Sequence, residues 1–294
     1  MNLSPFKIWI LATRPQTLPA SVAPVILGTA MAWGDGVSHW PSAWLALLGA
    51  LCLQVGTNLV NDYFDFKNGV DTEDRLGPLR VVQTGLVHPR RMMCAVALVF
   101  GFAALISSLL VLRAGWPIAV IAVTSILSAI FYTAGPHPLG YIGLGEALVF
   151  IFFGPVAVMG TYYVQSFEMH AGVFWAGIAA GCFSSAILVV NNLRDIETDR
   201  RSRKKTLAVR FGASFARREY LTFIFTGSFV PVLLYLIIND HRWILLSPLV
   251  FFFAFPCLEA VFTRTDGPAL NKTLAQTGLL LIVFTVLFSI GWSL

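Results

Sequence analysis

The chain has 294 residues, of which 57% are hydrophobic and only 12% are charged, with a formal net charge of +5. Soluble proteins carry about 25% charged residues, because a surface that faces water needs them. The apolar residues also come in long blocks rather than in alternating patterns. The composition therefore excludes an ordinary water-soluble protein and indicates a surface that mostly faces lipid.

Nine apolar runs approach the roughly 20 residues that cross about 30 Å of hydrocarbon. They cover residues 17–33, 44–60, 92–112, 116–132, 143–164, 173–193, 220–238, 243–262 and 273–292. Trp33, Trp44, Trp116, Trp243 and Trp292 fall at the ends of these runs, where indole rings favour the membrane interface. The sequence predicts an all-α integral membrane protein with nine transmembrane helices in one domain, residues 1–294.

The first run has one rival interpretation, a cleaved signal peptide. That run contains Pro19 and Pro24, begins after Arg14 and is followed by eight further spans, so we expect it to remain as a helix. No transit peptide is recognisable, which favours the bacterial inner membrane.

The basic residues indicate the orientation of the chain. If the N-terminus is cytoplasmic, only Arg113 and Arg242 of the 20 Lys and Arg fall on the far side. This asymmetry is the positive-inside signal. The basic excess is thus explained by topology, and it is no argument for nucleic-acid binding.

Charged residues concentrate in two segments, both on the expected cytoplasmic side. The second segment follows the sixth span and begins NNLRDIETDRR at Asn191. Asn191, Asp195 and Asp199 recur every four residues, so on a helix they would share one face.

The first segment follows the second span and reads NLVNDYFDFKNGVDTEDR from Asn58. Asn61 and Asp65 repeat the four-residue spacing, with Asp62 beside Asn61. The third position is Gly69, and an acid returns at Asp71. Glycine at this position predicts that the helix ends there and that Asp71 reaches back from a loop.

The two segments lie four spans apart, which places them at the same membrane face and predicts a parallel repeat of four helices with the ninth left over. Acids stacked on one face repel each other, and Mg²⁺ relieves this repulsion while keeping sites for waters and phosphate oxygens. We therefore expect a Mg²⁺–diphosphate site. The same segments hold basic side chains that would neutralise phosphate, namely Lys67, Arg75, Arg80, Arg194, Lys204 and Lys205. The alternative is a pair of ordinary solvated loops.

At these residues the sequence resembles the UbiA superfamily of membrane prenyltransferases. The likeness covers nearly the whole chain, from RPQTLPASVAPVILGTA at Arg14 to NNLRDIETDRRSRKKTLAVRFG at Asn191. The segments LGPLR at Leu76 and PLGYIGLGE at Pro138 resemble the branch that prenylates 1,4-dihydroxy-2-naphthoate. The resemblance implies nine helices around a central cavity and transfer of a polyprenyl group from its diphosphate to this acceptor. CO₂ and pyrophosphate would be lost, giving a demethylmenaquinone.

The resemblance also assigns roles to matching residues. The first metal–diphosphate motif would comprise Asn61, Asp62, Asp65 and Asp71, and the second Asn191, Asp195 and Asp199. Arg80 and Lys204 match basic positions that contact phosphate. Tyr132 would lie near the reactive end of the prenyl chain, where its ring face can stabilise carbocation charge; the alternative is a residue of the interfacial aromatic belt.

The carboxylate of the acceptor needs a partner, for which Arg14 and Arg75 are candidates. Glu146, just inside the fifth span, is expected near the acceptor hydroxyl, because an ionisable group in a span is usually functional; the alternative is a paired structural carboxylate. Arg203 departs from the branch, which usually carries Gly before the Lys of the second motif.

Three other functions remain open. Acceptors such as 4-hydroxybenzoate or homogentisate are alternatives within the superfamily. A cation-coupled transporter would hide its acids near the bilayer midplane on broken helices. A transferase for CDP-alcohols would carry one signature on adjacent helices instead of two separated motifs.

Overall fold

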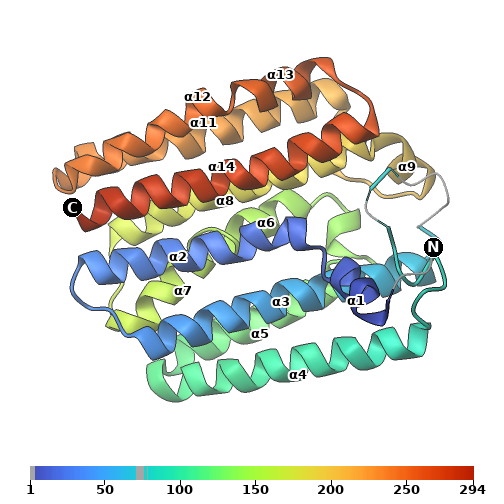
Figure 1. Ribbon diagram of the computed structural model, residues 1–294, viewed down its shortest axis with the longest axis horizontal. Helices are drawn as coiled ribbons and strands as arrows, with labels where there is room; N and C mark the ends of the chain where they lie inside the picture. Colours follow the sequence, from blue (N-terminus) through green and yellow to red (C-terminus); the bar gives the residue numbers. More distant parts are fainter. Residues whose placement is uncertain (1–3, 71–75, 78) are drawn as a thin grey trace.

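A computed structural model describes residues 4–70, 76, 77 and 79–294 of the chain. All regular elements in this part are helical, and they form a bundle of long, roughly parallel and antiparallel helices (Figure 1). In chain order the elements are α1 (Pro5–Thr13), η1 (Pro15–Thr17), α2 (Leu18–Gly34), α3 (Trp40–Lys67), α4 (Pro89–Ala114), α5 (Trp116–Phe131), η2 (Leu139–Tyr141), α6 (Gly145–Phe152), α7 (Pro155–Ser166), α8 (Ala171–Arg194), α9 (Ile196–Arg201), α10 (Leu207–Phe211), α11 (Ala213–Ile238), η3 (Arg242–Leu249), α12 (Val250–Phe253), α13 (Phe255–Thr263) and α14 (Gly267–Ser293).

The nine predicted spans all appear as helical segments. Eight segments among the described residues are long and apolar enough to cross a membrane, and the remaining predicted span, 116–132, is the shorter apolar helix α5. The two ends of the chain lie at opposite ends of the bundle, as an odd number of crossings requires (Figure 1). The predicted all-α membrane fold is confirmed.

The predicted repeat agrees with the packing in one respect. The second and third spans, α3 and α4, pack on each other, and so do their counterparts α8 and α11, four spans later. The repeat itself stays a prediction.

Two spans are interrupted, which the apolar runs did not indicate. The fifth is split at Gly154 into α6 and α7, where a Cβ atom would lie 2.7 Å from the carbonyl oxygen of Gly177 on α8. The eighth consists of η3, α12 and α13, with Pro248 inside η3 and Pro256 at the start of α13. Proline removes a helical hydrogen bond and clashes with the preceding turn, so an unbroken helix is disfavoured there.

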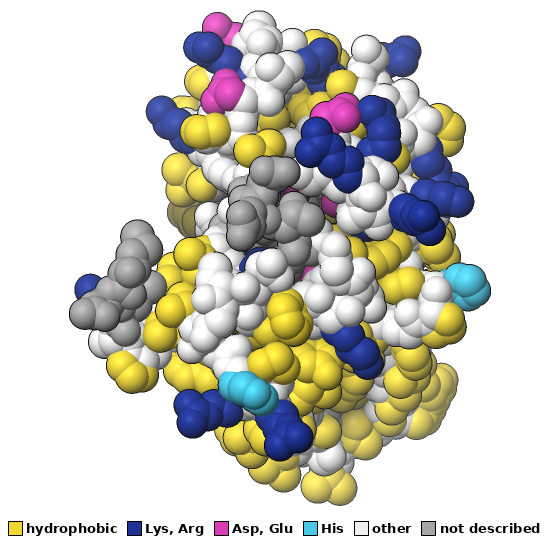
Figure 2. All heavy atoms as spheres, turned by 90° about the vertical axis from the view of Figure 1, so that its right-hand side faces the viewer, with side chains coloured by type: hydrophobic (Ala, Val, Ile, Leu, Met, Phe, Trp, Pro, Cys, Tyr) yellow, Lys and Arg dark blue, Asp and Glu magenta, His cyan; other side chains and the backbone are white. Residues whose placement is uncertain are grey.

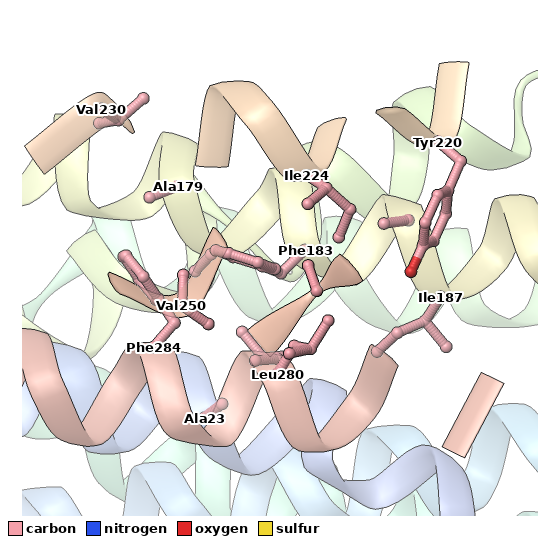
Figure 3. Packing of buried hydrophobic residues seen from close by; sticks show 14 of the residues in the cluster. Ala23, Ala179, Phe183, Ile187, Tyr220, Ile224, Val230, Val250, Leu280 and Phe284 are labelled. Carbon is pink, nitrogen blue, oxygen red and sulfur yellow. The ribbon is translucent and has the colours of Figure 1, made fainter. Parts of the chain in front are cut away.

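Helix α8 forms the centre of the bundle and packs against α2, α6, α7, α11 and α14. Ala179 and Ala180 are fully buried, and their small side chains let neighbouring helices approach closely, as is common between membrane helices. Phe183 from α8 meets Phe284 from α14 with ring centroids 5.0 Å apart (Figure 3). This rigid core holds the end of α8, and with it the second aspartate motif, in place.

One end of the bundle is basic. Seen from the right-hand side of Figure 1, Lys and Arg side chains gather there, with a few acidic side chains among them (Figure 2). Helices α1 and α9 lie at this end (Figure 1). Helix α9 belongs to the second charged segment, and Lys204, which follows it, has its Nζ 3.4 Å from Asp65 Oδ1 of the first, so both segments share one face, as their even spacing predicted.

Candidate active site

A cavity of about 380 Å³ runs inside the bundle, between helices that include α2, α3, α5, α7 and α8. Much of its wall is apolar, with side chains such as Leu53, Ile121, Phe152 and Val156. Polar and charged side chains gather where α3 and α8 end. The predicted site residues that line it are Arg14, Asn61, Asp65, Arg80, Tyr132, Asn191, Asp195, Asp199 and Lys204. The cavity thus combines an apolar chamber with a charged end.

Asp65 is the centre of the first cluster and is only 1% exposed. Its Oδ2 accepts a hydrogen bond from Arg80 Nη2 at 2.5 Å, and its Oδ1 accepts one from the hydroxyl of Tyr141. Lys204 Nζ lies 3.4 Å from the same Oδ1. A buried carboxylate needs such partners to remain charged. Tyr141 was missed by the sequence reasoning, since no spacing links it to Asp65.

Asp195 is the centre of the second cluster. Arg194 donates to both of its oxygens, from Nε at 2.8 Å and from Nη2 at 2.6 Å, so the pair is bidentate. The same guanidinium donates to Asn191 Oδ1 at 2.7 Å and, from Nη1, to Asn271 Oδ1 at 2.6 Å. Asn271, on α14, was also missed. The predicted phosphate ligand Arg194 is thus buried outside the cavity and orients the carboxylate of Asp195.

Lys204 joins the two clusters. Its Nζ lies 3.4 Å from Asp65 Oδ1 and 4.0 Å from Asp199 Oδ1, and it stands 4.6 Å from the centroid of the Tyr141 ring. The carboxylates of Asp65 and Asp199, more than 130 positions apart in the chain, therefore meet at the ammonium group of Lys204. This arrangement agrees with the expectation that the two segments lie at the same membrane face.

The helix that carries the second motif is broken, whereas the sequence suggested one continuous face. Helix α8 ends at Arg194, Asp195 has φ −97° and ψ 8°, and α9 begins at Ile196. The four-residue spacing survives in the backbone, because Asp195 N–H donates to Asn191 O at 3.1 Å and Asp199 N–H donates to Asp195 O at 2.8 Å.

The first motif ends its helix as predicted. Helix α3 stops at Lys67, and Gly69 adopts φ 66°, a conformation that favours glycine. Lys67 is exposed, stands 5.7 Å from the Phe64 ring centroid and does not line the cavity. The expected contributions of Asp71 and Arg75 lie outside the described residues.

Asp62, which the resemblance implies as a metal ligand, accepts hydrogen bonds from two backbone N–H groups. Its Oδ2 accepts from Val81 N–H at 3.1 Å and its Oδ1 from Val82 N–H at 3.2 Å, and the residue is 1% exposed. These bonds fix the segment that carries Arg80. In this structure Asp62 therefore orients the arginine that pairs with Asp65.

Tyr132 lies at the end of α5 against two glycines. A Cβ atom on Gly140 would be 2.8 Å from Tyr132 Cε1, and one on Gly145 would be 3.0 Å from the Tyr132 hydroxyl oxygen. Gly140 N–H also donates to Tyr132 O at 3.0 Å. The segment that contains PLGYIGLGE thus holds the ring in the cavity wall. Glycine is required at positions 140 and 145 because a larger side chain there would collide with this ring.

Glu146 does not line the cavity. It is 4% exposed, and its Oε1 accepts from Asn192 Nδ2 at 2.7 Å. The side chain is placed beside Asn192, which does line the cavity. Glu146 is therefore a buried carboxylate with one hydrogen-bonded oxygen, and Asn192 lies between it and the cavity.

Arg203 occupies a strained turn. Its φ is 60°, in the left-handed region that glycine adopts without steric cost. The backbone N–H of the next residue, Lys204, donates a hydrogen bond to Asp199 O at 2.9 Å. The turn therefore presents Lys204 to both clusters although glycine is absent.

The donor chemistry fits a hard divalent cation. Asp65, Asp195 and Asp199 offer carboxylate oxygens at the charged end of the cavity. Within the described residues no group of three His, Cys, Asp or Glu side chains is close enough to hold a metal by itself. Mg²⁺ does not need such a cage, because it is usually bound by one or two carboxylates together with substrate phosphate oxygens and waters.

The fold and the site together define a polytopic integral membrane protein with an apolar cavity that ends in two facing aspartate motifs. The profile of the UbiA prenyltransferase family matches residues 21–277. The chain therefore belongs to the UbiA prenyltransferase family, as the resemblance implied.

Close relatives cover the chain almost end to end. It is 38% identical to the 1,4-dihydroxy-2-naphthoate octaprenyltransferase of Mycobacterium tuberculosis, over 97% of this chain and 96% of the relative. It is 36% identical to the enzyme of the same name from Escherichia coli, over 99% and 96%. The structure of a UbiA homologue from Archaeoglobus fulgidus bound to GPP and Mg²⁺ superposes with a TM-score of 0.70 at 15% identity, covering 96% of this chain and 99% of that one. At this identity the superposition shows a shared fold.

Proposed function

We propose that the protein transfers a polyprenyl group from polyprenyl diphosphate to 1,4-dihydroxy-2-naphthoate. The observation that carries the proposal is the meeting of two aspartate motifs at Lys204, at the charged end of an otherwise apolar cavity. The names of relatives at 38% and 36% identity support this acceptor.

The reaction balances without an external oxidant. The C–O bond between the prenyl group and the diphosphate breaks, and its electron pair leaves with pyrophosphate. A C–C bond forms at the ring carbon that bears the carboxylate, and that carboxylate leaves as CO₂. The product is demethylmenaquinol, the reduced form of demethylmenaquinone.

The charged end of the cavity would bind the diphosphate. Asp65, Asp195 and Asp199 would hold Mg²⁺, which supplies charge neutralisation for the leaving pyrophosphate. Arg80 and Lys204 now neutralise Asp65, and both are within reach of a phosphate at the same place. Asp62 and Arg194 would orient the groups that make these contacts.

The apolar part of the cavity would take the prenyl chain and exclude water that would trap an allylic cation as an alcohol. The ring of Tyr132 would face the carbon that loses the diphosphate, where a π-face favours positive charge. Arg14 would take the carboxylate of the acceptor. Glu146 would act on the acceptor through Asn192, to which it is hydrogen-bonded.

The location would be the inner membrane of a bacterium, with the basic end of the bundle in the cytoplasm. A cation-coupled transporter is not favoured. Transporter acids tend to lie at midplane breaks. Here the mid-span break at Gly154 carries no acid, and the break at Asp195 lies where α8 ends, at the same end of the bundle as the first motif.

The proposal is tested by giving the purified protein a labelled polyprenyl diphosphate with each of three acceptors, namely 1,4-dihydroxy-2-naphthoate, 4-hydroxybenzoate and homogentisate. A product with the mass of demethylmenaquinol and release of CO₂ from the first acceptor would support it. Turnover of another acceptor instead would contradict the assigned substrate, and no turnover of any acceptor by folded protein would contradict prenyl transfer.

A further inference from the structure

A polar patch lies on the cavity wall where η1 meets α3, away from the aspartates. Thr17, Gln54 and Asn58 all line the cavity there. Gln54 Nε2 donates to Thr17 Oγ1 at 3.1 Å, and Asn58 Nδ2 donates to the same oxygen at 3.0 Å and to Thr13 O at 2.8 Å. The patch is an ordered network within an otherwise apolar stretch of wall.

The hydroxyl of Thr17 determines which way the amide of Gln54 points. A hydroxyl has one proton to donate and two lone pairs to accept. Thr17 Oγ1 donates its proton to Arg14 O at 3.0 Å, so it can only accept from its other two partners. The nitrogen of the Gln54 amide must therefore face Thr17, and its oxygen must face the other way.

This leaves Gln54 Oε1 as an acceptor that needs a donor. The residue is 7% exposed, and within the described part of the chain Oε1 has no hydrogen-bond partner. Buried polar atoms are nearly always paired, with protein, water or ligand. Gln54 lines the cavity, although Oε1 itself has almost no exposed surface, so a small shift of the neighbouring side chains would let a molecule bound there supply the missing donor.

The position along α3 indicates which part of the substrates reaches this atom. Helix α3 rises about 1.5 Å per residue, so Gln54 lies roughly 10 Å deeper than Asn61 and about 16 Å deeper than Asp65. The diphosphate is therefore not the ligand of Gln54. A prenyl chain reaches this depth but has no hydrogen-bond donor, whereas a hydroquinone acceptor carries two hydroxyls.

We propose that Gln54 Oε1 accepts a hydrogen bond from one ring hydroxyl of the aromatic acceptor, and that Thr17 is the positioning residue that aims it. The inference rests on the proposed function and deepens it, because it assigns a selectivity residue for the acceptor. Arg14, whose carbonyl holds Thr17, lines the same wall and brings the site for the carboxylate next to the site for the hydroxyl.

The test compares Gln54→Leu with the unaltered protein, using 1,4-dihydroxy-2-naphthoate as substrate and its two monohydroxy analogues, 1-hydroxy-2-naphthoate and 4-hydroxy-2-naphthoate, as competitive inhibitors. Loss of one hydrogen bond should raise the KM for the dihydroxy acceptor about three- to tenfold. The inhibition constant of one analogue should rise by the same factor and that of the other should not change. The KM for the polyprenyl diphosphate should stay constant.

Two further comparisons guard against a merely structural effect. Thr57→Val is the matched control, since Thr57 lies on the same helix and lines the same cavity wall. Its hydroxyl donates to Leu53 O at 2.7 Å within the helix rather than to Gln54. Thr17→Val should reproduce the selective loss, and Thr17→Ser, which keeps the hydroxyl, should restore it. If Gln54→Leu does not fold, Gln54→Met is compared in the same way.

An equal rise for both analogues, or a rise in the KM for the diphosphate in place of the acceptor, would overturn the assignment of Gln54. Failure of the unaltered protein to prenylate dihydroxynaphthoate would instead overturn the proposed function. The two failures are thus distinguishable in one set of assays.

Discussion

The glycine at position 140 should control catalysis through the ring of Tyr132. A Cβ atom there would lie 2.8 Å from Cε1 and 2.9 Å from Cζ of that ring. Carbon atoms in contact prefer about 3.5–4.0 Å, so Gly140→Ala must displace the ring by roughly 0.7 Å or more. A misplacement near 1 Å in a reacting geometry can cost about 100-fold in rate. We expect Gly140→Ala to lower kcat by roughly 10- to 100-fold while the KM for the diphosphate changes little.

The assay is steady-state product formation with saturating acceptor, on protein whose melting temperature shows that it is folded. Gly101→Ala is the matched control, because a Cβ atom on Gly101, within α4, would meet nothing within 4 Å. In a Tyr132→Ala background the Gly140→Ala change should cost almost nothing further, since both act on one ring. A wild-type kcat for Gly140→Ala, or an equal loss in both backgrounds, would refute the reasoning.

Three further changes test other parts of the site. Asp62→Asn replaces one of the oxygens that accept from Val81 and Val82, so it should destabilise the protein by about 1–3 kcal/mol and weaken diphosphate binding; an unchanged melting temperature and KM would contradict its orienting role. Arg203→Gly removes a left-handed residue that costs about 1–2 kcal/mol, so it should raise the melting temperature and keep activity; loss of activity would mean that the guanidinium contacts substrate. Glu146→Gln should fold yet lose activity if the carboxylate acts on the acceptor, and wild-type kinetics would exclude that role.

Much of the fold was predictable because lipid imposes a simple rule. A spanning segment must be long, apolar and helical, since no water is present to satisfy its backbone. The spans were therefore readable from runs such as 92–112 and 173–193, which became α4 and α8. The breaks in the fifth and eighth spans were not predicted, because the contact of Gly154 with α8 joins distant residues. Helix α1 was missed because it is short and flanks the first run.

The site was predictable in part for a related reason. Charge is rare in this chain, so the aspartates at 65, 195 and 199 stood out, and all three line the cavity. The partners of these groups were less visible. Arg80 and Arg194 were expected to contact phosphate, but each is hydrogen-bonded to an aspartate in this structure. Such pairings depend on how the helix ends and loops fold back, and one-dimensional spacing carries no signal for them.

The central claim is that both aspartate motifs form one Mg²⁺–diphosphate site for prenyl transfer. The most direct test is turnover of labelled polyprenyl diphosphate with 1,4-dihydroxy-2-naphthoate, in Mg²⁺ or in EDTA, by the unaltered protein and by Asp65→Ala and Asp195→Ala. We predict Mg²⁺-dependent formation of demethylmenaquinol that is lost in both variants and in EDTA. Full activity in EDTA, or in either folded variant, would contradict the account.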